Sequence, residues 1–338
     1  MFKKIKEFLK SDLAFILSLI LFFIICNIKM DYFINVGGGI SDAADRIKVE
    51  DKYKSKGSFN ISYVSQLEGN LLTYVMSYIV PSWEREKVEN YKYTDEETVD
   101  DVDYRSDLYL DTANSTATYW AYTLAGKDVE LKSSKAYIIA ILSKDVKNLK
   151  VGDEVVDIDG ISFIDFSTCR EYISSKEVGD ELTINIIRNK KNKSVKVKVY
   201  EEDGNKYIGI AVSFKNEYKV NPKVDINFKK SESGSSAGSI TTLEIYNQLT
   251  EKDLTKGKTI AGTGTIEADG SIGQIGGVEH KILGAVKGKA DIFLCPGGDN
   301  YKEAKKYIKD NNFKIKLIKA ETIQEAIEKL EALQWELV

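Results

Sequence analysis

The spacing of apolar and polar positions changes several times along the chain, and the first segment is almost wholly apolar. Residues 13–28 read LAFILSLILFFIICNI and follow Lys3, Lys4, Lys6 and Lys10. As a helix this run covers about 24 Å, which is enough to span a bilayer if flanking lysines extend outward. We therefore predict a membrane anchor over residues 13–29, with the basic segment 1–12 in the cytoplasm and residues 30–338 outside it. A cleaved signal peptide is the alternative, although no small-x-small site closely follows the run.

Between residues 30 and 132 the apolar positions follow a strand-like spacing in one part and a helix-like spacing in another. Gly37-Gly38-Gly39 predicts a turn, and the alternation in residues 58–64 (SFNISYV) predicts a strand. Helical spacing follows over residues 66–90, with Pro81 suited to a first-turn position, and over residues 97–126.

From residue 133 to 213 apolar and polar residues mainly alternate, and Gly-Asp and Asp-Gly turns interrupt the alternation. This pattern predicts a compact β-rich domain with one helix. The expected strands lie at 136–141, within 149–163, and at 181–188, 194–202 and 207–212, with the helix near 165–176.

Strand and helix patterns alternate from residue 214 to 338, which is typical of an α/β layer domain. The expected strands are 223–230, those within 259–273, 290–296 and 314–320, and the expected helices are 236–250, 277–288, 300–311 and 322–334.

Charge and composition narrow the functional classes. The net charge is −4, with Lys, Arg, Asp and Glu mixed along most of the chain, so nucleic-acid binding is not expected. Cys26, Cys169 and Cys295 are far apart and odd in number, and His280 is the single histidine. Neither a disulfide framework nor a Cys/His zinc site is therefore expected, and we assign no metal or cofactor.

The most informative short motif is Gly234-Ser235-Ser236-Ala237-Gly238, which fits the G-x-S-x-G pattern of a nucleophilic serine at a strand-to-helix turn. Gly234 can adopt the positive φ of a tight turn, and free N–H groups near Ser236 and Ala237 could hold an oxyanion. Gly/Ser stretches also form ordinary turns in which a serine only caps the helix. A hydrolase triad would depend on His280 alone, so a buried lysine with a lowered pKa is the other candidate base.

Three segments together resemble the proteolytic domain of Lon-type serine–lysine peptidases. The family's G-P-S-A-G matches residues 234–238, with Ser235 at the proline position, and its P-I-G-G-Φ-x-x-K-Φ-x-A matches Gln274 to Ala285, with Gly284 in place of an alanine. The resemblance implies that Ser236 is the nucleophile and Lys281 its base. It also implies that Thr263, in the matching strand 262–266, hydrogen-bonds the lysine.

Residues 149–160 (LKVGDEVVDIDG), followed by a helix and a strand pair, resemble a bacterial PDZ domain. PDZ domains bind an extended peptide as an added strand. No clear Gly-Φ-Gly-Φ loop precedes residues 136–141, so a spacer that binds nothing is the alternative.

The order of segments resembles the membrane-anchored PDZ–Lon peptidases of Gram-positive bacteria. The implied fold is an α/β (α+β) Lon-type proteolytic domain (214–338) preceded by a PDZ-like domain (133–213), a strand and helical region (30–132) and a transmembrane helix. The implied function is an endopeptidase that cleaves exported peptides or exposed protein segments outside the cytoplasm, and family members often assemble as homo-oligomers. The alternative is a non-catalytic membrane-tethered adaptor.

ATP is not expected to drive this chain. Gly257-Lys258-Thr259 looks like the end of a P-loop, but Lys252 stands where its first glycine should be. Any substrate must therefore be extended already.

Overall fold

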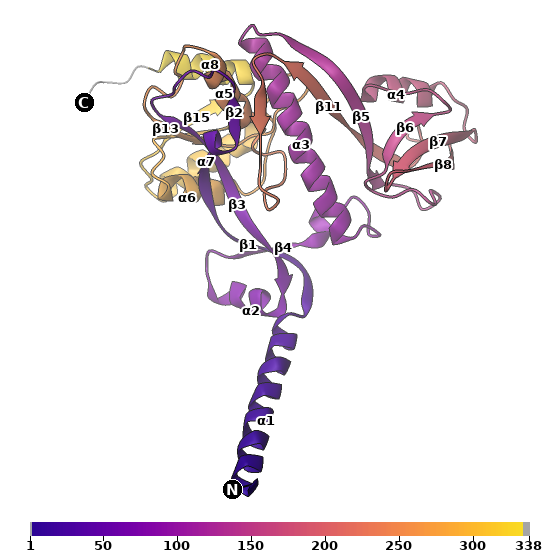
Figure 1. Ribbon diagram of the computed structural model, residues 1–338. Coiled ribbons are helices and arrows are strands. Elements are labelled where there is room, and N and C mark those ends of the chain that lie inside the picture. The colour runs from indigo at the N-terminus through magenta and orange to yellow at the C-terminus, as the bar shows by residue number, and fades with distance from the viewer. Residues whose placement is uncertain (1, 334–338) are drawn as a thin grey trace. The chain divides into compact units, whose positions relative to one another are not determined.

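The computed structural model describes the backbone of residues 2–333 and, in α1, the side chains from Leu13 onward (Figure 1). The side chains of the predicted cytoplasmic segment 1–12, and residues 334–338, lie outside the described residues. The chain divides into two compact units, one formed by residues 1–37 and 64–92 and the other by residues 38–63 and 93–338.

The first unit contains α1 (Phe2–Cys26), the beginning of β1 (Lys29–Asp42), the end of β3 (Ser58–Asn70), α2 (Leu71–Ile79), β4 (Glu84–Lys87) and the short helix η2 (Val88–Tyr91). Strand β4 pairs antiparallel with β1, with Tyr32 opposite Lys87. In the part of the chain that is described, no helix has both the length and the apolar composition needed to cross a membrane.

The helix predicted over residues 66–90 is confirmed only for Leu71–Ile79, and its two ends are wrong. Strand β3 continues to Asn70, and a capping box between Asn70 and Thr73 then starts α2. The helix ends at Ile79 because Val80 precedes Pro81, and a residue before proline favours an extended backbone. Pro81 therefore follows a helix instead of starting one.

The second unit is built around five strands of a six-stranded sheet, in the order β15-β14-β13-β3-β1, of which Figure 1 labels β15, β13, β3 and β1. Strand β13 (Thr259–Gly262) lies parallel to both β14 (Ile292–Pro296) and β3, and β14 lies parallel to β15 (Lys316–Ala320). The remaining elements of this layer are η1 (Ala43–Asp45), β2 (Ile47–Val49), β12 (Val224–Ile226), α5 (Gly238–Leu249), α6 (Val278–Lys287), α7 (Gly298–Asp310) and α8 (Ile323–Ala332).

Segments distant in sequence complete this layer. Ser58–Ile61 of β3 pair with β13, and β2 pairs antiparallel with β12. Ile47 and Phe59 from these early strands are fully buried in the same apolar core as Leu243 and Ile260. Residues from the region predicted as 30–132 therefore share one core with residues after 214.

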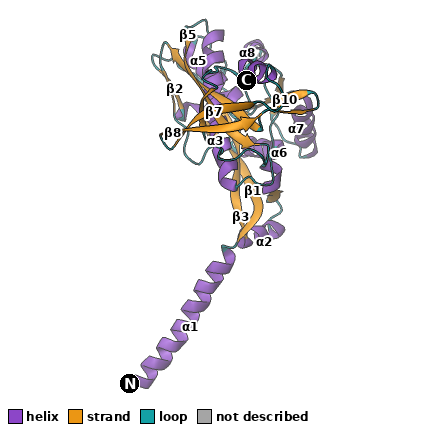
Figure 2. Cartoon of the chain, turned by 90° about the vertical axis from the view of Figure 1, so that its right-hand side faces the viewer, coloured by secondary structure: helices purple, strands orange, loops and turns teal. Residues whose placement is uncertain are grey.

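A second sheet, antiparallel and of five strands, has the order β11-β5-β6-β7-β8, with all five labelled in Figure 1 and β5, β7 and β8 seen from another side in Figure 2. Fully or almost fully buried isoleucines, among them Ile138, Ile184 and Ile186, form its own core. Its elements are β5 (Val129–Ile141), β6 (Glu154–Ile158), α4 (Phe166–Ser174), β7 (Glu181–Arg188), β8 (Lys191–Lys198) and β11 (Ile210–Val220), with a small hairpin of β9 (Tyr200–Glu202) and β10 (Asn205–Tyr207).

The long helix α3 (Val99–Leu124) packs against α5, which belongs with the sheet of β13 to β15, and against β5 and β11 of the five-stranded antiparallel sheet. A capping box between Thr98 and Asp101 starts it. The prediction of a helix over 97–126 is confirmed.

One local prediction is wrong and two are confirmed only in part, because pairing with distant strands overrides the local pattern. The Gly37–Gly39 run lies inside strand β1 and is not a turn. Only Val224–Ile226 of the predicted strand 223–230 pairs, and only Thr259–Gly262 of the region 259–273 forms a named strand. The β12 ladder ends early because its partner β2 is itself only three residues long, whereas β13 stops at Gly262 although its partner β3 continues to Asn70.

Candidate active site

Two glycines shape the turn that carries Ser236. Gly234 has φ +85°, and its N–H donates to the carbonyl of Ser106 in α3 at 2.9 Å. A Cβ on Gly238 would lie 2.8 Å from the backbone nitrogen of Ile266, so only glycine allows this close approach. The backbone conformation at Gly234 and the close packing at Gly238 therefore explain why both positions of the G-x-S-x-G motif are glycine.

The carbonyl of Ser236 is held by two donors. The Gly264 N–H donates to it at 2.9 Å and the Thr263 hydroxyl at 3.1 Å, while the Ser239 N–H donates to the Gly264 carbonyl at 3.0 Å. Among the described hydrogen bonds, the N–H groups of Ser236 and Ala237 donate to none. These two N–H groups precede the first turn of α5, where the helix dipole favours negative charge.

Lys281 lies in the first turns of α6, which begins after Gly277 in the left-handed conformation. Its side chain is buried, with a residue exposure of 4%, and its Nζ donates to the Thr263 hydroxyl at 2.9 Å. Burial lowers the pKa of Lys281 from 10.5 to about 7 because the charged form loses its hydration. About half of the lysine is therefore neutral near pH 7, against about one part in several thousand for an exposed lysine.

Thr263 lies immediately after β13 and is fully buried. It accepts from Lys281 Nζ and donates to the Ser236 carbonyl, so one hydroxyl contacts both residues. The structure thus brings the three predicted residues Ser236, Thr263 and Lys281 to one place.

Helix α6 lies against the glycines of β1. A Cβ on Gly284 would lie 2.6 Å from the Gly39 nitrogen and 2.9 Å from the Gly38 carbonyl carbon. A Cβ on Gly38 would in turn lie 2.4 Å from the carbonyl oxygen of His280. The glycine at position 284, where the related family has alanine, is therefore explained by a strand that crosses this face of the helix.

His280 is buried in α6, directly before Lys281. Side chains of consecutive helical residues point in directions about 100° apart, so they do not face the same point. The geometry thus gives no reason to prefer His280 over Lys281 as the base.

Sequence reasoning missed Ser106, Gly38 and Gly39. Ser106 contributes only a backbone carbonyl to the Ser236 turn, and any residue could supply that group. The triple glycine was the one available signal, because three glycines in a strand indicate close approach of another backbone.

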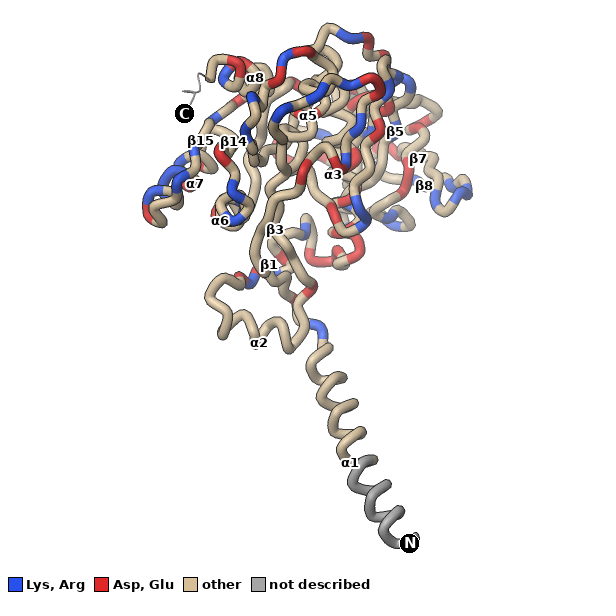
Figure 3. The backbone as a smooth tube through the Cα atoms, turned by 60° about the vertical axis from the view of Figure 1, so that its left-hand side comes forward, with Lys and Arg blue, Asp and Glu red and all other residues tan. Residues whose placement is uncertain are grey.

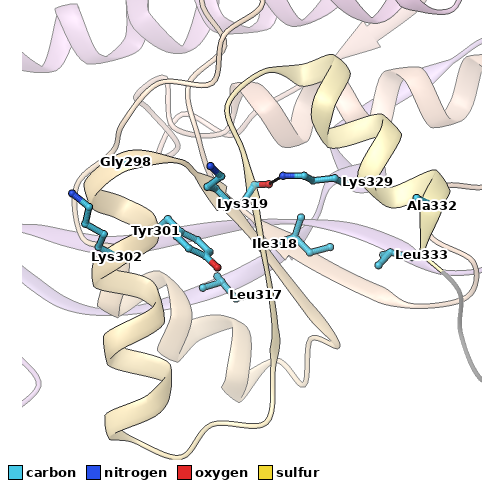
Figure 4. A pocket seen from close by; sticks show the side chains of 9 residues that line it. All are labelled: Gly298, Tyr301, Lys302, Leu317, Ile318, Lys319, Lys329, Ala332 and Leu333. Carbon is cyan, nitrogen blue, oxygen red and sulfur yellow. Dashed lines mark hydrogen bonds between the residues drawn. The ribbon is translucent and has the colours of Figure 1, made fainter.

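A cavity of about 590 Å³ lies elsewhere, between α7, β15 and α8 (Figure 4). None of Ser236, Thr263 and Lys281 lines it. Its lining residues are Gly298, Tyr301, Lys302, Leu317, Ile318, Lys319, Lys329, Ala332 and Leu333. Among the described residues, no group of three His, Cys, Asp or Glu side chains is placed to hold a metal ion.

Two parts of the chain match known protein families, one in the region of each sheet. Residues 214–333 match the family model described as the Lon protease (S16) C-terminal proteolytic domain, and residues 125–199 match the PDZ domain model. The chain carries a PDZ domain and a Lon-type proteolytic domain. No curated protein matches the chain.

Among solved structures, the chain is similar to the PDZ domains of two SdrC-like proteins. The one from Listeria monocytogenes is 30% identical, covers 25% of this chain and 92% of its own, and has a TM-score of 0.22. The one from Listeria innocua is 31% identical, covers 23% of this chain and 92% of its own, and also has a TM-score of 0.22.

The Lon-type domain contains all three residues described above, because Ser236, Thr263 and Lys281 fall within residues 214–333. A proteolytic domain of this type supports a peptidase as the activity of the chain. The strands that pair with it from outside this range, β2 and β3, precede the PDZ domain in the sequence.

Proposed function

We propose that the chain is an ATP-independent serine endopeptidase in which Ser236 is the nucleophile and Lys281 the general base. The observation that carries this proposal is the fully buried Thr263 hydroxyl, which contacts both Lys281 Nζ and the Ser236 carbonyl. A buried lysine that shares a hydrogen-bonding partner with a serine before a helix N-terminus supplies the base and the nucleophile that serine activation requires.

The arrangement suits acyl transfer in the following way. Neutral Lys281 donates one N–H to Thr263, which leaves its lone pair to accept the proton of the Ser236 hydroxyl. The Ser236 oxygen attacks the scissile carbonyl, and the N–H groups of Ser236 and Ala237 stabilise the oxyanion. The C–N bond then breaks as protonated Lys281 gives its proton to the leaving amine. Water, deprotonated by the same lysine, releases the acyl group from Ser236.

We propose that the PDZ domain presents extended substrate to this site. Strand β11 is an edge strand, and its first residues, from Ile210 to Phe214, precede the part that α3 contacts at Lys215 and Asn216. Gly209, directly before β11, has φ +76°, and its carbonyl accepts from the N–H groups of Leu142 and Ser143. An edge strand beside α4 is the kind of surface to which a peptide adds as a further strand.

We propose that residues 13–29 hold the enzyme at the membrane, with residues 30–338 on the outer face. The support is the apolar run, the four lysines before it and the exposure of its side chains. Substrates would then be exported peptides or exposed protein segments. Extraction of cell membranes with alkaline carbonate tests the attachment, and digestion of intact cells with an added protease tests the side.

The proposed chemistry is tested by cleavage of an unstructured protein by the purified chain, with and without ATP. Ser236→Ala is expected to abolish cleavage, while the matched variant Ser235→Ala retains it because only the neighbouring hydroxyl is lost. Equal cleavage by the wild-type and Ser236→Ala proteins would show that Ser236 is not the nucleophile. If the wild-type protein bound peptides and cleaved none, the chain would be an adaptor.

The pH dependence of cleavage tests the base. Because the neutral form of Lys281 is the active form and its pKa is lowered to about 7, kcat is expected to rise as the pH increases through about 7. Lys281→Met, which keeps an apolar side chain of similar length in the buried site, is expected to lower kcat by a factor of at least about 1000. A rate that is unchanged between acidic and mildly alkaline pH would exclude Lys281 as the base.

A further inference from the structure

Helix α2 in the first unit is amphipathic with its apolar side facing outward. Leu72, Val75 and Ile79, at the spacing of one helix face, are 46%, 48% and 66% exposed. Ser77 faces inward, where its hydroxyl accepts from the Arg85 guanidinium at 3.0 Å. A helix on a water-exposed protein surface normally shows the opposite arrangement.

The apolar surface continues beyond the helix. Residues 71–83 read LLTYVMSYIVPSW and contain no charged residue, and the α2 segment is uniformly tan in Figure 3. Tyr78 is 65% exposed, and the Arg85 guanidinium lies 3.9 Å from the centre of its ring. Tyrosine and tryptophan with a nearby cation are the residues enriched where a bilayer meets water.

This surface is continuous with the apolar part of α1. The N–H of Leu71, the first residue of α2, donates to the carbonyl of Ile28 at 2.9 Å. Within α1, each large apolar side chain from Leu13 to Ile25 is at least 42% exposed. These consecutive positions point in all directions around the helix, whereas a protein partner would cover one stripe. A lipid environment surrounds a helix on every side.

We propose that residues 71–83 lie in the polar–apolar interface of a lipid bilayer, beside the end of α1, as a second membrane-contacting element. The outward face of α2 would enter the boundary between headgroups and acyl chains by about 5–10 Å. Arg85 would remain at headgroup level, above the ring of Tyr78. The inference rests on the proposed membrane location and not on the proposed peptidase chemistry.

Fluorescence of a label on α2 in vesicles tests this placement. The full chain with Ile79→Cys is labelled with an environment-sensitive dye and reconstituted into phosphatidylcholine vesicles containing a minor fraction of phosphatidylglycerol. Emission is expected to shift to shorter wavelength and to be quenched by a lipid with a nitroxide near its headgroup. Glu89→Cys, an exposed position of the same unit, is the matched control and should show neither effect. The unsubstituted chain is the blank, because Cys26, Cys169 and Cys295 are buried.

The outcomes separate the inference from the location on which it rests. If the protein floats with the vesicles but the label at position 79 stays in water, the inference is wrong and the proposed membrane location stands. Failure of the protein to float with vesicles would refute both. Shielding of the label without quenching by the lipid nitroxide, together with cross-links between two labelled chains, would show that a second copy covers α2 and would overturn the inference. Leu72→Lys combined with Ile79→Lys should abolish quenching of a label at Val75→Cys if lipid is the occupant.

Discussion

A buried lysine in α6 and a buried glutamate in α5, the helix that follows Ser236, both have strongly shifted pKa values. Lys281 in α6 has its pKa lowered to about 7, and Glu244 in α5 has its pKa raised to about 7, both mainly by burial. The lysine donates to Thr263, whereas Glu244 accepts from the Gln248 amide at 2.5 Å. Gln248 also contacts the Val49 nitrogen, so the Glu244 site lies against β2 and has no part in the proposed chemistry.

Glu244 is expected to make stability depend on pH. Its folded-state pKa is above its unfolded value of 4.5, so the native state binds more protons between pH 4.5 and 7. Stability therefore falls as the pH rises through this window, and Glu244→Gln should remove the fall. At pH 8 the variant is expected to be more stable by roughly 3 kcal/mol, and at pH 4 the two proteins should differ little. Denaturant unfolding at several pH values measures this, and an identical pH profile for both proteins would contradict it.

The proposed nucleophile and base, and Thr263 between them, were predictable from the sequence, whereas Ser106 at the serine turn and the buried Glu244 were not. Ser236 and Lys281 belong to motifs in which the side chain itself is required. Ser106 acts through its carbonyl and Glu244 through its burial, and neither property leaves a sequence signature. The edge strand proposed to bind peptide also has no clear sequence signal, because Gly209 comes after the other strands of the sheet in the chain and does not precede residues 136–141.

At the scale of elements, α6 is fixed by contact with β1. An alanine at position 284 would favour the helix by about 1 kcal/mol in isolation. In the protein its Cβ would overlap the backbone of Gly38 and Gly39, which cannot move as a side chain can. The helix must therefore shift, and Lys281, three residues earlier, shifts with it.

Gly284→Ala is accordingly expected to lower kcat by roughly ten- to a hundredfold, with a smaller change in KM, because the proposed base moves and the peptide-binding surface does not. Overpacking should also cost about 1–3 kcal/mol of stability. Lys287→Ala, at an exposed position of the same helix, is the matched control and should change neither value by much. Steady-state kinetics and thermal unfolding of both variants measure the effects. Wild-type kinetics in Gly284→Ala would show that α6 is not positioned by β1.

Helices with their own capping residues and apolar spacing were predicted well. Strands whose ends depend on pairing with strands far away in the sequence were not. Helix α3 has its own cap and a long apolar face. The segment after β3 has helical spacing throughout, but pairing extends β3 to Asn70 and leaves only Leu71–Ile79 helical. No local pattern distinguishes these outcomes, because the choice depends on strands elsewhere in the chain.

At the scale of the second unit, the Lon-type domain is discontinuous in sequence. Strand β3 lies before the PDZ domain and β13 after it, yet they are parallel neighbours in one sheet. Strand β2 pairs with β12 across the same interval. The PDZ domain is therefore inserted into the chain between strands of one sheet, and α3 packs against both parts.

A fragment limited to residues 214–333, the range that matches the proteolytic family model, should therefore fail to form a stable domain. It lacks Ile47, Phe59 and Ile61, which are at most 8% exposed in the shared core, and it leaves the edge of β13 without its parallel neighbour. Each such apolar side chain contributes about 1.5–3 kcal/mol, so the combined loss is comparable to the whole stability of a typical domain. Circular dichroism and protease resistance of this fragment should indicate an unfolded or loosely folded chain without cleavage activity, whereas residues 30–338 should be folded and active. A stably folded, active 214–333 fragment would show that the early strands are dispensable, and the contacts of β2 and β3 would then have to stabilise something other than the catalytic layer.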